Sequence, residues 1–251
     1  TDTHLASERE TGYNRGETKP REGALSMTKK ERAKLAVEAL KAEYPGAVCS
    51  LEYQDPLQLL IATRLSAQCT DARVNLVTPG LFARFPTLEA FCEGTVEEIG
   101  ELIRSCGFYN TKSKDILGMC LMIRDEFGGQ VPDTIEELTR LPGVGRKTAN
   151  LIVGDIYHKP AVVTDTHCIR IAGRLGLTEN TAPEKVENDL RAILPPEESN
   201  DFCHRLVLHG RAVCTARKAY CEQCCMAPFC KKTGVGPNGE KVAAKKKPAR
   251  K

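Results

Sequence analysis

Residues 141–150 read LPGVGRKTAN, and this stretch decides the fold of the chain. Helical periodicity on both sides predicts a short helix that ends at the leucine and a second helix that starts at the arginine, so the Pro-Gly-Val-Gly sequence between them must turn tightly. Such a turn needs a residue at positive φ, which glycine adopts most easily. It exposes backbone N–H groups at the start of the second helix, and we expect those around Gly143, Val144 and Gly145 to bind a phosphate oxygen. An ordinary turn between two helices is the alternative.

The rest of the chain carries the same helical signal. Apolar residues recur at helical spacing, Asp55-Pro56 is a typical helix start, and Pro45-Gly46 is a typical helix stop. The sequence shows no convincing alternation of the kind that marks a β-strand, and no internal repeat. It therefore predicts an all-α protein with short connections. The segments before about residue 26 and after about residue 234 are predicted to be tails.

Two residues near the turn suggest chemistry. Lys147 lies in the first turn of the second predicted helix. An isolated lysine is most often a solvated surface residue, but a positive charge is unfavourable at a helix N-terminus, so this place favours the neutral, nucleophilic amine. At pH 7 only about one lysine in 10³ to 10⁴ is neutral. Eighteen residues later, in VVTDTH, Asp165 precedes another predicted helix, and capping that helix is its simplest role.

The cysteines are unevenly distributed. Five of the twelve lie between Cys214 and Cys230. The N-terminal residues contain acids and no apolar core, so we expect no secretory signal and no disulfides. We interpret the seven other cysteines as buried thiols. The C-terminal group needs a different explanation.

Composition and charge narrow the possible partners. The chain is 41% hydrophobic and 27% charged, which is typical of a globular protein, and no apolar run reaches the length of a membrane span. From Arg211 to Lys251 there are 11 Lys and Arg against 2 Asp and Glu, although the net charge is only +3. This asymmetry favours a polyanion partner, most commonly nucleic acid, and a solubilising tail is the alternative.

Taken together, these motifs resemble one family. LPGVGRKTAN, then VVTDTH, then Cys-x6-Cys-x2-Cys-x5-Cys resemble the endonuclease III family of DNA glycosylases, whose hairpin is a helix-hairpin-helix motif. The similarity continues upstream in LLIATRLSAQCTD and GFYNTKSKDI. It covers about residues 30–232 and keeps the family's order.

The resemblance implies a fold and a cofactor. A [4Fe–4S] cluster would be bound by Cys214, Cys221, Cys224 and Cys230, with Cys225 a packing thiol. Zinc is the alternative, although zinc sites usually pair two Cys-x2-Cys knuckles across a longer gap. The expected division is residues 1–27 as a disordered tail, 28–48 with 160–234 as the cluster domain, 49–159 as a six-helix domain with the hairpin, and 235–251 as a basic tail.

The resemblance also implies residue roles. Lys147 would attack C1′ of a damaged nucleotide and form a Schiff base that leads to β-elimination, and Asp165 would stabilise positive charge on the sugar. Gln68 would fill the space that the flipped nucleotide leaves in the stack, and Phe108 stands where the family usually has a leucine wedge. Arg217 and Lys218, in the loop between the first two cluster ligands, would contact DNA phosphates.

The implied partner is double-stranded DNA that contains oxidised or ring-saturated pyrimidines or abasic sites. We expect a monomer that does not bind membranes, located in the cytoplasm at the bacterial nucleoid, or in the nucleus or mitochondrion of a eukaryote. Three alternatives remain: an adenine or mismatch glycosylase of the same superfamily, a non-catalytic helix-hairpin-helix DNA-binding protein, and a zinc-bound structural protein.

Overall fold

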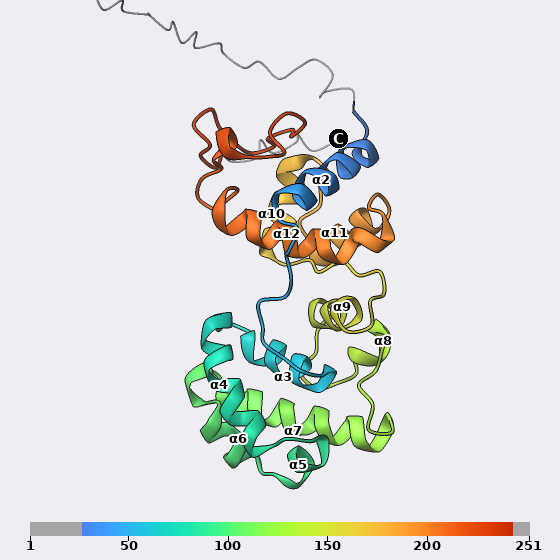
Figure 1. The fold of residues 1–251 in the computed structure, drawn as a ribbon, viewed down its shortest axis with the longest axis vertical. Helices are drawn as coiled ribbons and strands as arrows, with labels where there is room; N and C mark the ends of the chain where they lie inside the picture. Colours follow the sequence, from blue (N-terminus) through green and yellow to red (C-terminus); the bar gives the residue numbers. More distant parts are fainter. Residues whose placement is uncertain (1–26, 243–251) are drawn as a thin grey trace, which may run out of the picture.

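The computed structural model describes residues 27–242, and the regular structure in this part of the chain is helical (Figure 1). Pairing of extended backbone there is limited to three isolated antiparallel bridges. The all-α prediction is confirmed. In chain order the helices are α2 (Lys29–Glu43), α3 (Pro56–Ser66), α4 (Asp71–Arg84), α5 (Leu88–Glu93), α6 (Val96–Leu102), α7 (Tyr109–Glu126), α8 (Ile135–Leu138), α9 (Arg146–Asp155), α10 (Thr166–Leu175), α11 (Pro183–Arg191) and α12 (Ser199–Ala212), with 3₁₀ turns η1 (Arg104–Cys106), η2 (Pro196–Glu198) and η3 (Cys221–Gln223).

The helices gather toward two ends of the molecule. In Figure 1, α3 to α7 lie at one end, α2 and α10 to α12 lie at the other, and α8 and α9 lie between them. The first helix joins the C-terminal part of the chain, because α2 contacts α12 and the Arg32 Nε donates to the carbonyl of Phe229 at 3.0 Å. We refer to residues 49–159 as the hairpin lobe and to residues 27–48 with 160–242 as the cysteine lobe. The division into two domains at these residues stays a prediction.

Side-chain caps start several helices. Asp55 accepts from the backbone N–H of Gln58 and Pro56 occupies the first turn of α3, as the sequence predicts. Thr134 caps α8, and its side chain accepts from the N–H of Glu137. The preceding residue, Asp133, pairs with Lys159 at 2.7 Å.

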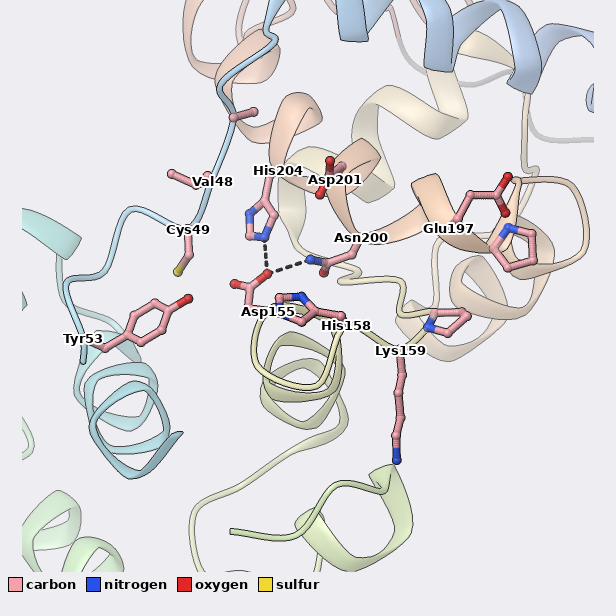
Figure 2. A pocket seen from close by; sticks show the side chains of 14 residues that line it. Val48, Cys49, Tyr53, Asp155, His158, Lys159, Glu197, Asn200, Asp201 and His204 are labelled. Carbon is pink, nitrogen blue, oxygen red and sulfur yellow. Dashed lines mark hydrogen bonds and ion pairs between the residues drawn. The ribbon is translucent and has the colours of Figure 1, made fainter. Parts of the chain in front are cut away.

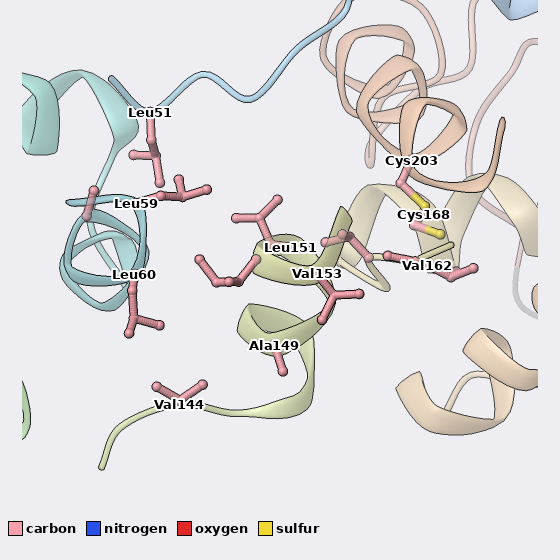
Figure 3. Close-up of a cluster of buried hydrophobic side chains, with 14 of the residues drawn as sticks. Leu51, Leu59, Leu60, Val144, Ala149, Leu151, Val153, Val162, Cys168 and Cys203 are labelled. Atoms are coloured by element: carbon pink, nitrogen blue, oxygen red, sulfur yellow. The ribbon is translucent and has the colours of Figure 1, made fainter. Parts of the chain in front are cut away.

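Helix α9 is held by apolar side chains on two sides. Figure 3 shows Leu59 and Leu60 of α3 on one side of α9, with Val162, Cys168 and Cys203 on the other. Ala149 of α9 is completely buried between them. Burying each large apolar side chain contributes about 1.5–3 kcal/mol. The N-terminus of α9, which carries the glycine turn, is therefore fixed relative to both lobes.

The described chain continues past the expected start of the C-terminal tail. Residues 234–242 form a small hairpin that pairs with the cysteine segment, where Ala219 N–H donates to the Gly239 carbonyl at 2.7 Å. Gly239 has φ +81°, and a side chain there would collide with the Ala219 carbonyl, so glycine is needed at this turn. Residues 1–26 and 243–251, which hold the N-terminal tail and most of the basic tail, lie outside the described residues. Within 27–242 no helix has the length and apolarity needed to cross a bilayer.

Candidate active site and metal centre

The turn between α8 and α9 uses its two glycines differently. Gly143 has φ +73°, and a Cβ there would lie 2.5 Å from the Arg64 Nε, where Arg64 pairs with Asp115. Gly145 has an ordinary φ of −94°, and a Cβ there would meet no atom of the described chain within 4 Å. The first glycine is therefore required by the fold, whereas the second leaves open space in front of a helix N-terminus.

The start of α9 has free backbone donors. No side chain caps this helix, and within residues 27–242 no backbone hydrogen bond uses the N–H of Gly143 or Gly145. The expectation for Val144 needs correction, because its N–H donates to the carbonyl of Leu141 at 3.1 Å and its side chain is buried. Free N–H groups at a helix N-terminus form an anion site.

The first charged residue of α9 is held in an ion pair with another helix. Arg146 forms a bidentate ion pair with Glu187 of α11, at 2.7 and 3.0 Å. Glu187 is 1% exposed, and although burial opposes its charge, hydrogen bonds from Arg146 and Arg191 lower its pKa overall. Lys147, the next residue, is exposed and has no ion-pair or hydrogen-bond partner among the described residues. Its amine is therefore free to face a ligand.

Lys147 and Asp165 line one cavity of about 430 Å³ between the lobes. Asp165 is the N-cap of α10, and its Oδ1 accepts from the N–H of Cys168 at 2.7 Å. The structure therefore gives Asp165 its simplest predicted role as a cap and also places it in the cavity with Lys147. The two roles are compatible, since a carboxylate has two oxygens and the cap uses one.

His167 lies in the same cavity. Burial lowers its pKa, with Arg170, Arg211 and Lys147 acting in the same direction and Asp165 opposing them. Arg170 Nη2 lies 3.1 Å from His167 Nδ1, and because arginine only donates, Nδ1 must accept. The neutral imidazole therefore carries its proton on Nε2.

Asp71 and Arg211 are cavity residues that sequence reasoning missed. Asp71 Oδ2 accepts from Ser50 Oγ at 2.6 Å and from Arg211 Nη2 at 3.0 Å. Asp71 starts α4 in the hairpin lobe, and Arg211 lies in the last turn of α12 in the cysteine lobe, so this pair joins the lobes at the cavity. An acidic residue in the first turn of a helix is common, and for that reason it gave no functional signal.

Gln68 and Phe108 share an unusual backbone. Both are exposed and both have left-handed backbone angles, with φ +54° and +48°. Phe108 is 67% exposed, which is uncommon for a large apolar side chain. Non-glycine residues avoid this region, so both positions carry backbone strain, as do His158 and Lys232.

The C-terminal cysteines form a compact group. Cys214, Cys221, Cys224 and Cys230 line one small cavity, and Cys225 does not. All twelve cysteines of the chain have free thiols; Cys49, Cys69 and Cys92 are half-buried rather than buried as expected. No three potential ligand side chains in residues 27–242 converge as the ligands of a single metal ion would. Four thiolates that bind four different irons stand further apart than ligands of one zinc ion.

The surroundings of these thiols fit an anionic cluster. Arg174 is 6% exposed, and its guanidinium donates to Cys214 Sγ at 3.3 Å and to the Thr215 carbonyl at 2.7 Å. His209 Nε2 lies 3.3 Å from Cys224 Sγ, and its Nδ1 lies 3.1 Å from the Tyr44 hydroxyl. Burial raises the pKa of Cys224 to about 12 and that of Cys230 to about 11, so a metal must displace their protons when it binds. A buried cation and a ring N–H beside these sulfurs suit bound thiolates.

Arg217 and Lys218 lie in the loop that follows the first of these cysteines. Both side chains are exposed. The loop is fixed by Thr215, whose Oγ1 accepts from the Lys218 N–H at 3.1 Å and donates to the Lys218 carbonyl at 2.6 Å. The structure thus presents two cations on an ordered loop.

A second cavity, of about 530 Å³, lies at the other end of α9 (Figure 2). There Asp155 Oδ1 accepts from Asn200 Nδ2 at 2.6 Å and pairs with His204 Nε2 at 2.7 Å, which joins α9 to α12. Although this cavity is larger, neither Lys147 nor Asp165 lines it. We therefore place the candidate active site in the smaller cavity, next to the glycine turn.

Comparison with known proteins identifies relatives of this chain. Residues 61–196 match the HhH-GPD superfamily base excision DNA repair protein model. The chain is 50% identical to endonuclease III of Synechocystis sp. over 204 residues, which cover 81% of this chain and 93% of that protein. It is 36% identical to endonuclease III of Escherichia coli K12 over 204 residues, which cover 81% of this chain and 96% of that protein.

Solved structures of related proteins also point to the endonuclease III family. The structure of a non-covalent endonuclease III–DNA complex is 38% identical in sequence, has a TM-score of 0.77, and covers 82% of this chain and 97% of its own. A trapped endonuclease III–DNA covalent intermediate gives the same values. A thermostable thymine-DNA glycosylase shares the fold at a TM-score of 0.73, but only 21% of the sequence. The chain belongs to the endonuclease III family of base excision DNA repair enzymes, within the HhH-GPD superfamily.

Proposed function

We propose that the protein is a bifunctional DNA N-glycosylase and AP lyase, with Lys147 as its nucleophile, that removes oxidised or ring-saturated pyrimidines from double-stranded DNA. The observation that carries the proposal is that Lys147 and Asp165 line one cavity beside an open helix N-terminus. A protein that only binds DNA needs the helix N-terminus, but it does not need a free amine and a carboxylate in a shared cavity. This protein acts as a monomer in the cytoplasm, at the nucleoid.

The DNA backbone is bound at two places. The free N–H groups of Gly143 and Gly145 take a phosphate at the start of α9, and Arg217 and Lys218 take phosphates at the cysteine lobe. A glycosidic bond inside a duplex cannot be reached, so the damaged nucleotide must leave the stack and enter the cavity. Gln68 and Phe108 fill the space that it leaves.

The chemistry follows from the groups in the cavity. The neutral amine of Lys147 attacks C1′, and the bond between C1′ and the base breaks, with its electron pair leaving on the base. The carboxylate of Asp165 keeps one oxygen on the Cys168 N–H, and its other oxygen stabilises positive charge on the sugar and helps to remove the amine proton. The amine-substituted sugar then opens: the C1′–O4′ bond breaks, its electron pair leaves on O4′, which takes up a proton, and the nitrogen and C1′ form the Schiff base. The Schiff base acidifies C2′, and loss of that proton breaks the C3′–O bond, so that the strand is nicked with the phosphate as leaving group.

The cluster fits as a structural group. Cys214, Cys221, Cys224 and Cys230 would hold a [4Fe–4S] cluster, which, when bound, closes the segment that carries the DNA-binding loop. Arg174 orients this loop through hydrogen bonds to the carbonyl of Thr215 and the sulfur of Cys214. In this proposal the cluster takes no part in breaking the glycosidic bond.

Borohydride trapping tests the proposal. The reagent reduces a Schiff base, so the wild-type protein should be captured as a covalent adduct with DNA that contains thymine glycol or an abasic site. Lys147→Gln should bind the same duplex, give no adduct, and lose excision and nicking by about 10³-fold or more. Lys185→Gln, a change at an exposed lysine of α11, is the matched control and should behave as wild type. An equal adduct with Lys147→Gln would assign the nucleophile to another amine.

A further inference from the structure

The two segments proposed to enter the DNA stack are held by one buried side chain. Gln68 lies in the connection from α3 to α4, and Phe108 lies between η1 and α7. These segments are forty residues apart in sequence, and three of their residues, Gln68, Gly107 and Phe108, have left-handed backbone angles. Strained segments keep such angles only when their surroundings fix them.

Lys112 of α7 supplies that fixation. Its side chain is 1% exposed, and its ammonium donates to the Leu65 carbonyl at 2.7 Å and to the Cys106 carbonyl at 2.9 Å. Leu65 lies in the last turn of α3, and Cys106 is the last residue of η1. Both carbonyls are at helix ends, where intrahelical partners are missing, so one ammonium caps the two elements that lead into Gln68 and Phe108.

A lysine is an unusual residue at a position as deeply buried as 112. Burial lowers the pKa of Lys112, because the charged ammonium loses water, and the neighbouring Cys69 and Cys106 partly offset this. An apolar side chain would fill the same space without that desolvation cost. Burial raises the pKa of the Cys106 thiol to about 11, and the neighbouring Cys69 raises it as well, so this thiol is neutral beside the ammonium.

We propose that Lys112 is a positioning residue that sets Gln68 and Phe108 as one unit, so that both enter the stack together when the damaged nucleotide leaves it. Lys112 does not touch DNA and acts through the two carbonyls. This inference rests on the proposed function and deepens it, because it assigns the opening of the duplex to a residue separate from the chemistry of Lys147.

The test separates opening of the duplex from bond breaking. Lys112→Met keeps an unbranched side chain, one bond shorter than lysine, but has no N–H donors, and exposed Lys114→Met on the same helix is the matched control. Each protein acts on thymine glycol in a fully paired duplex, and on an abasic site inside an unpaired bubble, where no stacked nucleotide has to be displaced. Thermal unfolding and the visible absorption of the cluster show whether the variant is folded.

We expect Lys112→Met to excise the paired lesion about 10- to 100-fold more slowly, because the two inserting residues are misplaced. Its nicking and borohydride trapping at the bubble should equal those of wild type, and Lys114→Met should match wild type on both substrates. Equal loss on both substrates, or no loss on either, would overturn the proposal. If Lys112→Met does not fold, Lys112→Gln, which keeps N–H donors on a side chain one bond shorter, is measured on the same two substrates. A wild-type protein inactive on both would instead refute the proposed function.

Discussion

Asp165 combines a structural role with a proposed chemical role in one side chain. Its first oxygen caps α10 through the N–H of Cys168, and the residue also lines the cavity with Lys147. From sequence, a cap could be predicted because an aspartate before a helix is common. The position of Lys147 relative to it does not follow from the residues alone, because the rest of α9 and the irregular segment 156–164 lie between them, and tertiary packing fixes the path of that segment. Asp71 was missed for the same reason, since its partner Arg211 lies 140 residues away.

Changing Asp165 in two ways separates these roles. Asp165→Asn keeps a capping oxygen, so its free energy of unfolding should stay within about 0.5 kcal/mol of wild type, while excision slows by about 10²-fold or more because the negative charge is lost. Asp165→Ala should lose about 1 kcal/mol of stability as well. Urea unfolding and single-turnover excision measure the two effects. Asp55, which caps α3 outside the cavity, is the control, and its alanine variant should lose stability alone. Normal excision by Asp165→Asn would contradict the proposed role of the charge.

At the scale of elements, the hairpin was predictable and its details were not. A Pro-Gly-Val-Gly sequence between two helical patterns leaves few alternatives to a tight turn, and α9 starts at Arg146 as predicted. Sequence alone could not say which glycine has positive φ, since that depends on Arg64 and Asp115 packing against Gly143. Nor could it say that the Val144 N–H is used within the turn.

The two glycines of the hairpin therefore make a matched pair of variants. Gly143→Ala places a side chain at φ +73° and against Arg64, so we expect it to lower the free energy of unfolding by about 1–3 kcal/mol. Gly145→Ala meets no neighbour and should cost about 1 kcal/mol or less, as a poorer helix cap, but it should weaken binding to damaged and undamaged duplex alike by crowding the phosphate. Chemical unfolding and DNA titration measure both. A larger loss of stability in Gly145→Ala than in Gly143→Ala would refute this assignment.

At the scale of the whole molecule, the cysteine lobe is assembled from distant parts of the chain. The segment after α12 contacts α10 through Arg174, contacts α2 through Arg32, and pairs with the hairpin at residues 234–242. The resemblance to the family implied that four of the five C-terminal cysteines are grouped, and these four line one cavity. The last hairpin was not foreseen, since a glycine-rich, basic composition is typical of a tail and its pairing depends on the Ala219 carbonyl and N–H.

Two neighbouring cysteines test the assignment of the metal site. Cys221→Ser should lose bound iron and the visible absorption of a cluster, and should unfold more easily, because binding of metal by the thiolates also contributes to folding. Cys225→Ser is the control, because Cys225 lies outside the cavity that the other four line. It should keep its iron and its colour. Iron analysis of both purified variants gives the answer, and loss of iron in Cys225→Ser alone would show that the ligand set is wrong.

We expect the cysteine lobe to supply part of the electrostatic attraction to DNA. The salt dependence of DNA binding measures this contribution. Each phosphate contact releases bound counterions, so the slope of log K against log salt falls in magnitude by about 0.9 for each contact removed. Arg217→Ala with Lys218→Ala should therefore reduce this slope by about 1.8, and should weaken binding to damaged and undamaged duplex equally, because phosphates carry no lesion information.

The control is Lys30→Ala with Lys34→Ala, which removes the same charge from exposed positions on α2 of the same lobe and should leave the slope unchanged. Excision measured at saturating protein should also be unchanged in the loop variant, since neither residue lines the cavity of Lys147. If the loop variant lost excision and kept its salt dependence, Arg217 and Lys218 would belong to the chemistry rather than to the phosphate contacts.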